Sequence, residues 1–116
     1  MYTIEKEIHL DAAHKIEGHE SCGFIHGHRY RVIVKITGTK LDKHGMLVDF
    51  GDLKSLLSKY DHCYLNEIIN PTTAEHLSKL FFYEIQEYCD KLSHTPKVVE
   101  IKVWETPTSC ATFRKV

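Results

Sequence analysis

Apolar and polar residues alternate along two long stretches near the start of the chain, residues 2–14 and residues 26–37. Side chains two apart on a β-strand point to the same face, so each stretch is predicted to be a strand with one buried face. The buried face of the first stretch holds Tyr2, Ile4, Ile8, Leu10, Ala12 and His14. That of the second holds His26, His28, Tyr30, Val32, Val34 and Ile36. Both strands therefore carry histidines on a face that is otherwise mostly apolar.

Helical spacing replaces the alternation in the middle of the chain. Asp49 is the predicted N-cap of a first helix, whose apolar residues are Leu53, Leu56, Leu57 and Tyr60. A second helix is predicted over residues 73–92, and Thr72 with Glu75 resembles a capping box at its start. One face of this helix holds Leu77, Leu80, Phe81, Ile85, Tyr88 and Leu92.

Three further segments are predicted strands: residues 46–48, 97–105 and 110–116. On the second of these, one face holds Val99, Ile101, Val103 and Glu105. The order strand, strand, strand, helix, helix, strand, strand predicts an α+β fold with an antiparallel sheet. A length of 116 residues suits a single domain over residues 1–116.

Composition narrows the classes of function. Apolar residues make up 42% of the chain and charged residues 27%, with a net charge of -1, as in ordinary globular proteins. Lysines and arginines form no cluster, so we expect no nucleic-acid partner. The first residues lack the apolar core of a signal peptide, and no apolar run approaches the roughly 20 residues of a membrane span. We therefore expect a cytoplasmic protein without membrane association, in which the 4 widely spaced cysteines form no disulfide framework.

The 9 histidines are the unusual feature of the composition. Residues two apart on a strand lie about 6.6 Å apart on one side, so the imidazoles of His26 and His28 can converge on one metal ion. His14 supplies a third ligand where the two strands pair. A single histidine on such a face is more often a core or edge residue, but three histidines with an open position are typical of catalytic zinc. We predict Zn²⁺ held by His14, His26 and His28.

Cys22 lies four residues before His26, and two interpretations compete. It is either a fourth zinc ligand in a closed structural site or a thiolate beside the metal that acts as base or nucleophile. We favour the catalytic interpretation. The role of a spectator fits the other cysteines better, Cys63, Cys89 and Cys110.

Two more features are candidates for chemistry. Asp61 directly precedes His62 in a predicted loop, where an aspartate can orient a histidine as an acid/base group near neutrality. The dipeptide alone fits an ordinary polar loop equally well. Glu105 ends an apolar strand face, and a buried carboxylate needs donors. It either meets an internal cation or accepts two N–H groups of a ligand, such as the amino-pyrimidinone edge of a pterin.

A set of motifs in order along the whole chain resembles the 6-pyruvoyl-tetrahydropterin synthase family. The motifs are Ala12-Ala13-His14, Cys22-x-x-x-His26-Gly27-His28, Val48-Asp49-Phe50, Leu53-Lys54, Asp61-His62-x-x-Leu65-Asn66, Asn70-Pro71-Thr72 and Glu105-Thr106. The set is specific, although only the motif around Cys22 would be so by itself. The short spacing from cysteine to histidine and the compact chain look most like the 6-carboxy-tetrahydropterin synthase branch, which serves queuosine (7-deazaguanine) synthesis.

The resemblance implies the tunnelling fold (T-fold), a four-stranded antiparallel sheet with two helices on one face. It also implies a homohexamer of two stacked trimeric barrels with active sites between subunits. The implied roles are zinc ligation by His14, His26 and His28, catalysis by Cys22, Asp61 and His62, and pterin binding by Glu105, Thr106 and the Thr72/Thr73 region. Residues 70–75 hold one residue more than the family pattern Pro-Thr-x-Glu, so either Thr72 or Thr73 could take the family role.

The implied activity is zinc-dependent conversion of 7,8-dihydroneopterin triphosphate to 6-carboxy-5,6,7,8-tetrahydropterin, acetaldehyde and triphosphate. One alternative is the pyruvoyl branch, which eliminates triphosphate without cutting the carbon chain. A second is a pterin- or zinc-binding protein without catalysis, although binding alone needs none of Cys22, Asp61 and His62. A third is a structural zinc protein, which would need Cys22 on the metal.

Overall fold

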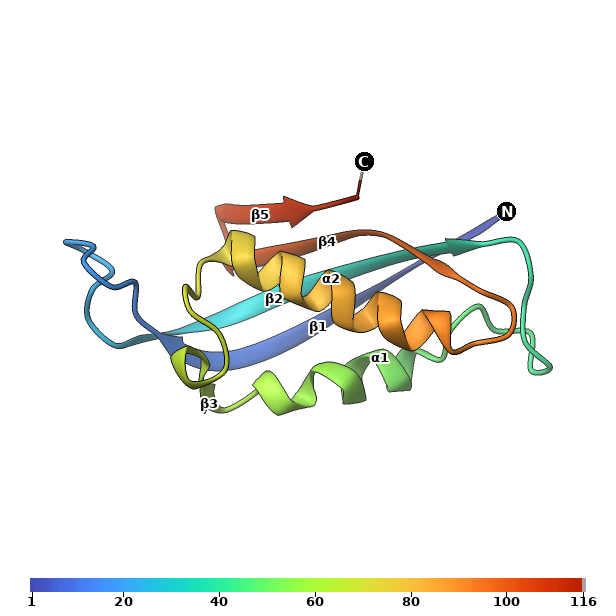
Figure 1. Ribbon diagram of the computed structural model, residues 1–116, viewed down its shortest axis with the longest axis horizontal. Helices are drawn as coiled ribbons and strands as arrows, with labels where there is room; N and C mark the ends of the chain where they lie inside the picture. Colours follow the sequence, from blue (N-terminus) through green and yellow to red (C-terminus); the bar gives the residue numbers. More distant parts are fainter. Residues whose placement is uncertain (116) are drawn as a thin grey trace.

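A five-stranded sheet forms the centre of the computed structural model, which describes residues 1–115. Strands β1 (Tyr2–His14) and β2 (His26–Gly38) are followed by helix α1 (Phe50–Leu57) and strand β3 (Cys63–Tyr64). Helix α2 (Ala74–Asp90) and strands β4 (Lys97–Thr106) and β5 (Ser109–Phe113) complete the chain. The strand order is β3-β1-β2-β4-β5, and all neighbours are antiparallel except β1 and β3. The predicted α+β fold is confirmed (Figure 1).

The pairing of β1 with β2 fixes which residues share a face. Their antiparallel register runs without interruption from Tyr2 opposite Gly38 to His14 opposite His26. Because side chains alternate along both strands, the two apolar faces coincide. Ile8, Leu10, Val32 and Val34 are accordingly buried, as the alternation predicted.

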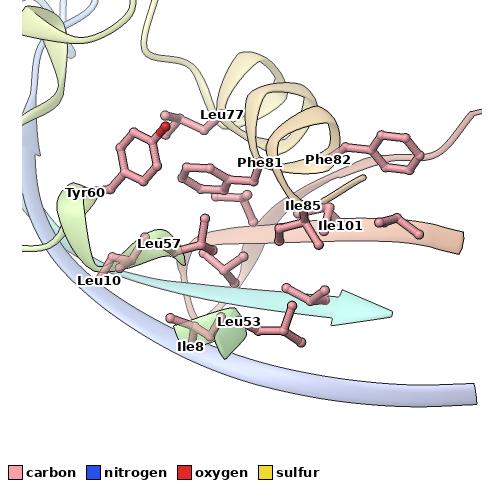
Figure 2. Packing of buried hydrophobic residues seen from close by; sticks show 14 of the residues in the cluster. Ile8, Leu10, Leu53, Leu57, Tyr60, Leu77, Phe81, Phe82, Ile85 and Ile101 are labelled. Atoms are coloured by element: carbon pink, nitrogen blue, oxygen red, sulfur yellow. The ribbon is translucent and has the colours of Figure 1, made fainter. Parts of the chain in front are cut away.

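Both helices cover this apolar face and share one hydrophobic core with it (Figure 1). Leu53 and Leu57 of α1 are fully buried, as are Leu77, Phe81 and Ile85 of α2. Figure 2 shows Phe81 and Ile85 pointing from α2 toward the sheet, with Tyr60 beside Phe81. The apolar stripe of each helix therefore faces the sheet, as its helical spacing predicted.

A side chain caps the start of each helix, but the cap of α2 is not the residue that the sequence predicted. Asp49 caps α1 as predicted, because its carboxylate accepts a hydrogen bond from the Gly51 backbone N–H at 2.8 Å. The cap of α2 is Thr73, whose hydroxyl accepts from the His76 backbone N–H at 3.3 Å. The predicted capping box from Thr72 to Glu75 is therefore wrong by one residue, because Thr72 is fully buried and bonded elsewhere.

The predicted strand at residues 46–48 is wrong. Leu47 and Val48 are buried, but in a turn rather than in the sheet. The Asp42 carboxylate accepts from the backbone N–H groups of His44 and Met46, and the Leu47 carbonyl accepts from His94 at 2.7 Å. These bonds satisfy the backbone locally, so the segment needs no strand partner.

The sheet has five strands rather than the four that the resemblance implied. The additional strand is the two-residue β3, which pairs in parallel with Ala12 and Ala13 of β1. The last predicted strand, residues 110–116, is observed over Ser109–Phe113, and its final residue lies outside the described part of the chain. Two residues carry too little hydrophobic pattern for β3 to be predicted.

The predicted inward face of β4 is wrong at Val99, which is 36% exposed. The register between β2 and β4 shifts at Lys35 and Ile36, which pair with Glu100 and Val98. The extra residue forms a β-bulge and reverses the alternation, so Val98 points inward in place of Val99. Ile101 and Val103 lie beyond the bulge and are buried as predicted.

The segments that hold the residues singled out for chemistry lie at one end of the sheet (Figure 1). This end contains the loop of residues 15–25, strand β3 and the start of α2. Among residues 1–115, none of the helices is long and apolar enough to cross a membrane.

Truncation of Phe81 tests the packing of α2 on the sheet. Phe81 is 1% exposed, and its ring lies 5.0 Å from that of Tyr60. Phe81→Ala is expected to lower the free energy of unfolding by about 3–5 kcal/mol, because the cavity cannot fully collapse. Denaturant unfolding followed by circular dichroism measures this. Lys79→Ala, on the exposed side of the same helix, should change it by less than about 0.5 kcal/mol.

Candidate active site

Three histidines from the two longest strands converge at this end of the sheet. His14 is the last residue of β1, and His26 and His28 are the first and third residues of β2. Ring centroids lie 4.6 Å apart for His14 and His26, 5.1 Å for His14 and His28, and 4.8 Å for His26 and His28. One ligand nitrogen from each ring lies within 4.8 Å of the other two. Three imidazoles at this spacing could hold a metal ion.

Hydrogen bonds from the flanking loops set the orientation of two of these rings. The Nδ1 atom of His14 lies 3.0 Å from the Thr72 carbonyl oxygen, and that of His26 lies 2.7 Å from the Phe24 carbonyl oxygen. A carbonyl oxygen only accepts, so each Nδ1 carries the proton and each Nε2 keeps its lone pair. Metal-binding histidines are oriented by such outer bonds.

The inner nitrogens of the cluster lack partners. Within residues 1–115, the Nε2 atoms of His14 and His28 are buried and have no hydrogen-bond partner. Burial lowers the pKa of His28 below its ordinary value, the Glu105 carboxylate opposes this shift, and His14 and His26 reinforce it. The neutral imidazole is thereby favoured, which is the form that binds a metal. A divalent metal ion fits these unpartnered nitrogens.

Tyr30 packs against the histidine cluster, although the sequence analysis did not select it as a site residue. Its ring meets those of His14 and His28 edge-on, with centroids 5.8 Å and 5.5 Å away. The side chain is 1% exposed. Its position on the same strand face as His28 could have indicated this contact, but a tyrosine on an apolar strand face is usually an ordinary core residue.

Glu105 lies beside the histidines, at an irregularity of β4. The register between β4 and β5 shifts between Trp104 and Thr106, so Glu105 occupies a β-bulge. Its two carboxylate oxygens lie 3.5 Å from Nε2 of His28 and 3.8 Å from Nε2 of His14. The side chain remains 26% exposed and lines open cavities on two sides. A carboxylate in this place can accept hydrogen bonds from a ligand next to the histidine cluster.

Cys22 lies in the compact loop of residues 15–25. Its backbone N–H donates to Nδ1 of His19 at 3.1 Å, and its carbonyl accepts from the Ile16 N–H at 2.7 Å. A side chain at Gly23 would collide with the His19 carbonyl oxygen, so the turn requires glycine there. Among the described residues, two groups lie close enough to hold a metal ion, the three histidines and Asp11 with Asp61 and His62, and Cys22 belongs to neither. This position does not favour the closed four-ligand interpretation.

A cavity of about 340 Å³ connects Cys22 with other predicted site residues. Its lining includes Cys22, Thr73 and Glu105, together with Cys110 of β5. Thr106 lines a neighbouring cavity that also contains Glu105 and Trp104. Thr72 lines neither cavity and is fully buried, so of the two candidate threonines it is Thr73 that faces the Cys22 cavity.

The structure places His62 at a different cavity, with Asp61 beside it. The Asp61 carboxylate accepts from the Asp11 N–H at 2.8 Å and lies 3.5 Å from Nε2 of His62. His62 has a φ of 56°, uncommon for a residue other than glycine, and its backbone N–H donates to the Asp11 carbonyl at 2.6 Å. Its side chain is 78% exposed and lines a cavity with His28 and Arg29. Cys22 does not line that cavity, so one chain does not bring the predicted triad together in one cavity.

Solved structures share this fold. The 6-pyruvoyl tetrahydropterin synthase of Caenorhabditis elegans aligns with a TM-score of 0.75 and 23% sequence identity. The alignment covers 99% of this chain and 96% of that one. Its two-layer arrangement is therefore the T-fold that the sequence motifs implied.

The sequence itself matches the family model described as 6-pyruvoyl tetrahydropterin synthase over residues 3–116, and the chain belongs to this family. It is 37% identical to the 6-carboxy-5,6,7,8-tetrahydropterin synthase of Bacillus subtilis (strain 168), over 97% of this chain and 85% of that protein. It is 30% identical to the enzyme of the same name from Haemophilus influenzae, over 99% of this chain and 100% of that protein. The resemblance drawn from the motifs is confirmed.

Removal of one histidine tests the metal site. Wild-type protein is expected to bind one Zn²⁺ per chain, and His28→Ala should bind almost none, because one of three protein ligands is lost. Elemental analysis after dialysis against a weak chelator measures the metal content. His44→Ala changes an exposed histidine in the turn before α1 and should keep the full content. Full zinc in folded His28→Ala would refute this ligand assignment.

Proposed function

We propose that this protein is a zinc-dependent 6-carboxy-5,6,7,8-tetrahydropterin synthase. The reaction converts 7,8-dihydroneopterin triphosphate and one water into 6-carboxy-5,6,7,8-tetrahydropterin, acetaldehyde and triphosphate. The observation that carries the proposal is the 37% identity to the Bacillus subtilis enzyme of that name over nearly the whole chain. The product would feed queuosine (7-deazapurine) synthesis in the cytoplasm.

His14, His26 and His28 would hold the zinc. Three imidazoles with no other protein ligand in their group would leave a coordination position for substrate oxygen. Bound there, zinc would supply Lewis acidity toward the side-chain oxygens of the substrate, which would acidify the adjacent C–H. The outer bonds of His14 and His26 keep their Nε2 atoms directed to the cluster.

The remaining residues would orient the pterin and move protons. Glu105 would accept hydrogen bonds from the amino group and a ring N–H of the pterin, since it lies next to the histidines and lines the Cys22 cavity. Thr73 and Thr106 line the cavities on either side of it. Cys22 would remove the acidified proton from the first side-chain carbon, and His62 would exchange protons with the other oxygens.

The placement of the triad supports a site shared between copies of the chain. Cys22 and His62 line different cavities, and the exposed imidazole of His62 points away from its own core. Strand β3 pairs only with the end of β1, and β5 is the other edge of the described sheet, so both edges offer backbone groups for pairing. Pairing of such edges would close trimeric barrels, and two barrels would make the proposed homohexamer. Asp61 would orient His62 toward the Cys22 of a neighbouring copy.

The second candidate is 6-pyruvoyl-tetrahydropterin synthesis, the activity named by the family model and by the Caenorhabditis elegans structure. Product analysis separates the two. Incubation of zinc-loaded protein with 7,8-dihydroneopterin triphosphate should release acetaldehyde and 6-carboxy-tetrahydropterin in equal amounts, measured by trapping the aldehyde and by mass spectrometry. A 6-pyruvoyl product without acetaldehyde would show the second activity, and unchanged substrate would refute both.

Replacement of Cys22 separates catalysis from metal binding. Cys22→Ala is expected to keep its zinc and to lose at least about a hundredfold in turnover, because proton removal loses its base. Cys110→Ala is the matched control, since this thiol lines the same cavity from β5 and should retain turnover. Loss of zinc in Cys22→Ala would instead support a closed four-ligand site.

Replacement of Glu105 tests the pterin anchor. Hydrogen bonds to a charged group contribute about 1.5–3 kcal/mol each, so losing two should weaken binding of the product pterin roughly a hundredfold or more. Glu105→Gln keeps the shape but turns one acceptor into a donor, and fluorescence titration measures the affinity. Glu87→Gln, on the exposed side of α2, serves as the control. Zinc content should not change, and wild-type pterin affinity in Glu105→Gln would mean that the pterin binds elsewhere.

A further inference from the structure

The side chain of Asn66 lies across the backbone of Lys15, the residue that follows His14. Its Oδ1 atom accepts from the Lys15 backbone N–H at 3.0 Å, and its Nδ2 atom donates to the Lys15 carbonyl at 2.9 Å. One amide side chain thus satisfies both backbone groups of Lys15, as a neighbouring strand would. Asn66 belongs to the short 3-10 helix at Leu65–Glu67, far from Lys15 in the sequence.

Thr72 links this contact to the metal-site histidine. Its hydroxyl donates to the Lys15 carbonyl at 3.2 Å and lies 3.4 Å from Oδ1 of Asn66. Its own carbonyl accepts from Nδ1 of His14 at 3.0 Å. Thr72 is fully buried, and His14 is 1% exposed. The bonds of Asn66 and Thr72 to Lys15 and His14, which we call the Asn66 clasp, therefore form one continuous network of direct hydrogen bonds.

The Asn66 clasp is located at the point where the chain leaves the sheet after β1. The ladder between β1 and β2 ends at His14 opposite His26, and the pairing of β1 with β3 ends one residue earlier, at Ala13. Lys15 leaves the sheet, and its ammonium group contacts only the exposed Glu17 among described acidic residues. The β1–β2 ladder fixes the face on which His14 lies, and the orientation of its ring also depends on a bond to Thr72, outside the sheet.

We propose that Asn66 is a positioning residue for the metal site, acting through Lys15 and Thr72 to aim Nε2 of His14 into the histidine cluster. This inference rests on the proposed metal site. Asn66 touches neither the cluster nor either cavity that Glu105 lines, so its effect is on metal affinity and coordination geometry. Outer partners of metal-binding histidines typically change metal affinity by about 10–100-fold.

The experiment measures Zn²⁺ affinity by competition with a chromophoric chelator, and the visible absorption of the Co²⁺-substituted protein as a readout of coordination geometry. Asn66→Ala is expected to bind Zn²⁺ about tenfold more weakly than wild type, the low end of that range because Asn66 reaches His14 through Lys15 and Thr72, with an altered Co²⁺ spectrum. Thr72→Val removes the hydroxyl but keeps the carbonyl that holds His14, so its loss should be smaller. Glu67→Ala changes the exposed neighbour of Asn66 on the same turn and should match wild type.

A second variant covers the case in which Asn66→Ala does not fold. Asn66→Asp keeps the acceptor for the Lys15 N–H but sets a carboxylate oxygen against the Lys15 carbonyl, and it should also weaken Zn²⁺ binding. Wild-type affinity and an unchanged Co²⁺ spectrum in folded Asn66 variants would overturn the proposal, even with a lowered melting temperature of the metal-free protein. Wild-type protein that binds no Zn²⁺ would overturn the metal site itself, and the clasp with it.

Discussion

The antiparallel register of β1 and β2 is the constraint on which the rest of the structure depends. It sets His14 opposite His26 and, two residues along β2, places His28 on the same inward face. A slip by one residue would turn one set of histidines to the other side of the sheet. The apolar residues further along both strands resist that slip, because it would also expose Ile8, Leu10 and their partners. Core packing and metal-site geometry are thus enforced by the same pairing.

The histidine cluster places polar imidazole nitrogens in a buried position. Unpartnered imidazole nitrogens in a buried position are costly, and the protein satisfies only the outward ones, through the carbonyls of Thr72 and Phe24. The inward nitrogens of His14 and His28 stay without partners among the described residues. A metal ion would satisfy them, so its binding would also stabilise the folded state.

Much of the fold and of the site could be read from the sequence, because both depend on alternation. Period two in residues 2–14 and 26–37 located both long strands and placed the histidines on one face. What failed depends on contacts between distant segments. Nothing local shows that His94 satisfies the Leu47 carbonyl, or that a bulge opposite Lys35 turns Val99 outward. That Thr73 rather than Thr72 lines the Cys22 cavity was equally hidden, because the Thr72 hydroxyl is bonded to the distant Lys15 carbonyl.

The two bulges of β4 bear on which changes in chain length the fold can accommodate. The first bulge, at Val99, absorbs one residue more than the ladder with β2 requires, whereas Ile101 and Val103 alternate strictly up to Glu105. Deleting Val99 would regularise the ladder and leave the orientation of Glu105 intact. Deleting one residue between Ile101 and Trp104 would turn Glu105 away from the histidines. In divergent sequences of this fold, length variation in β4 should therefore be accepted before Glu100 and rejected after it.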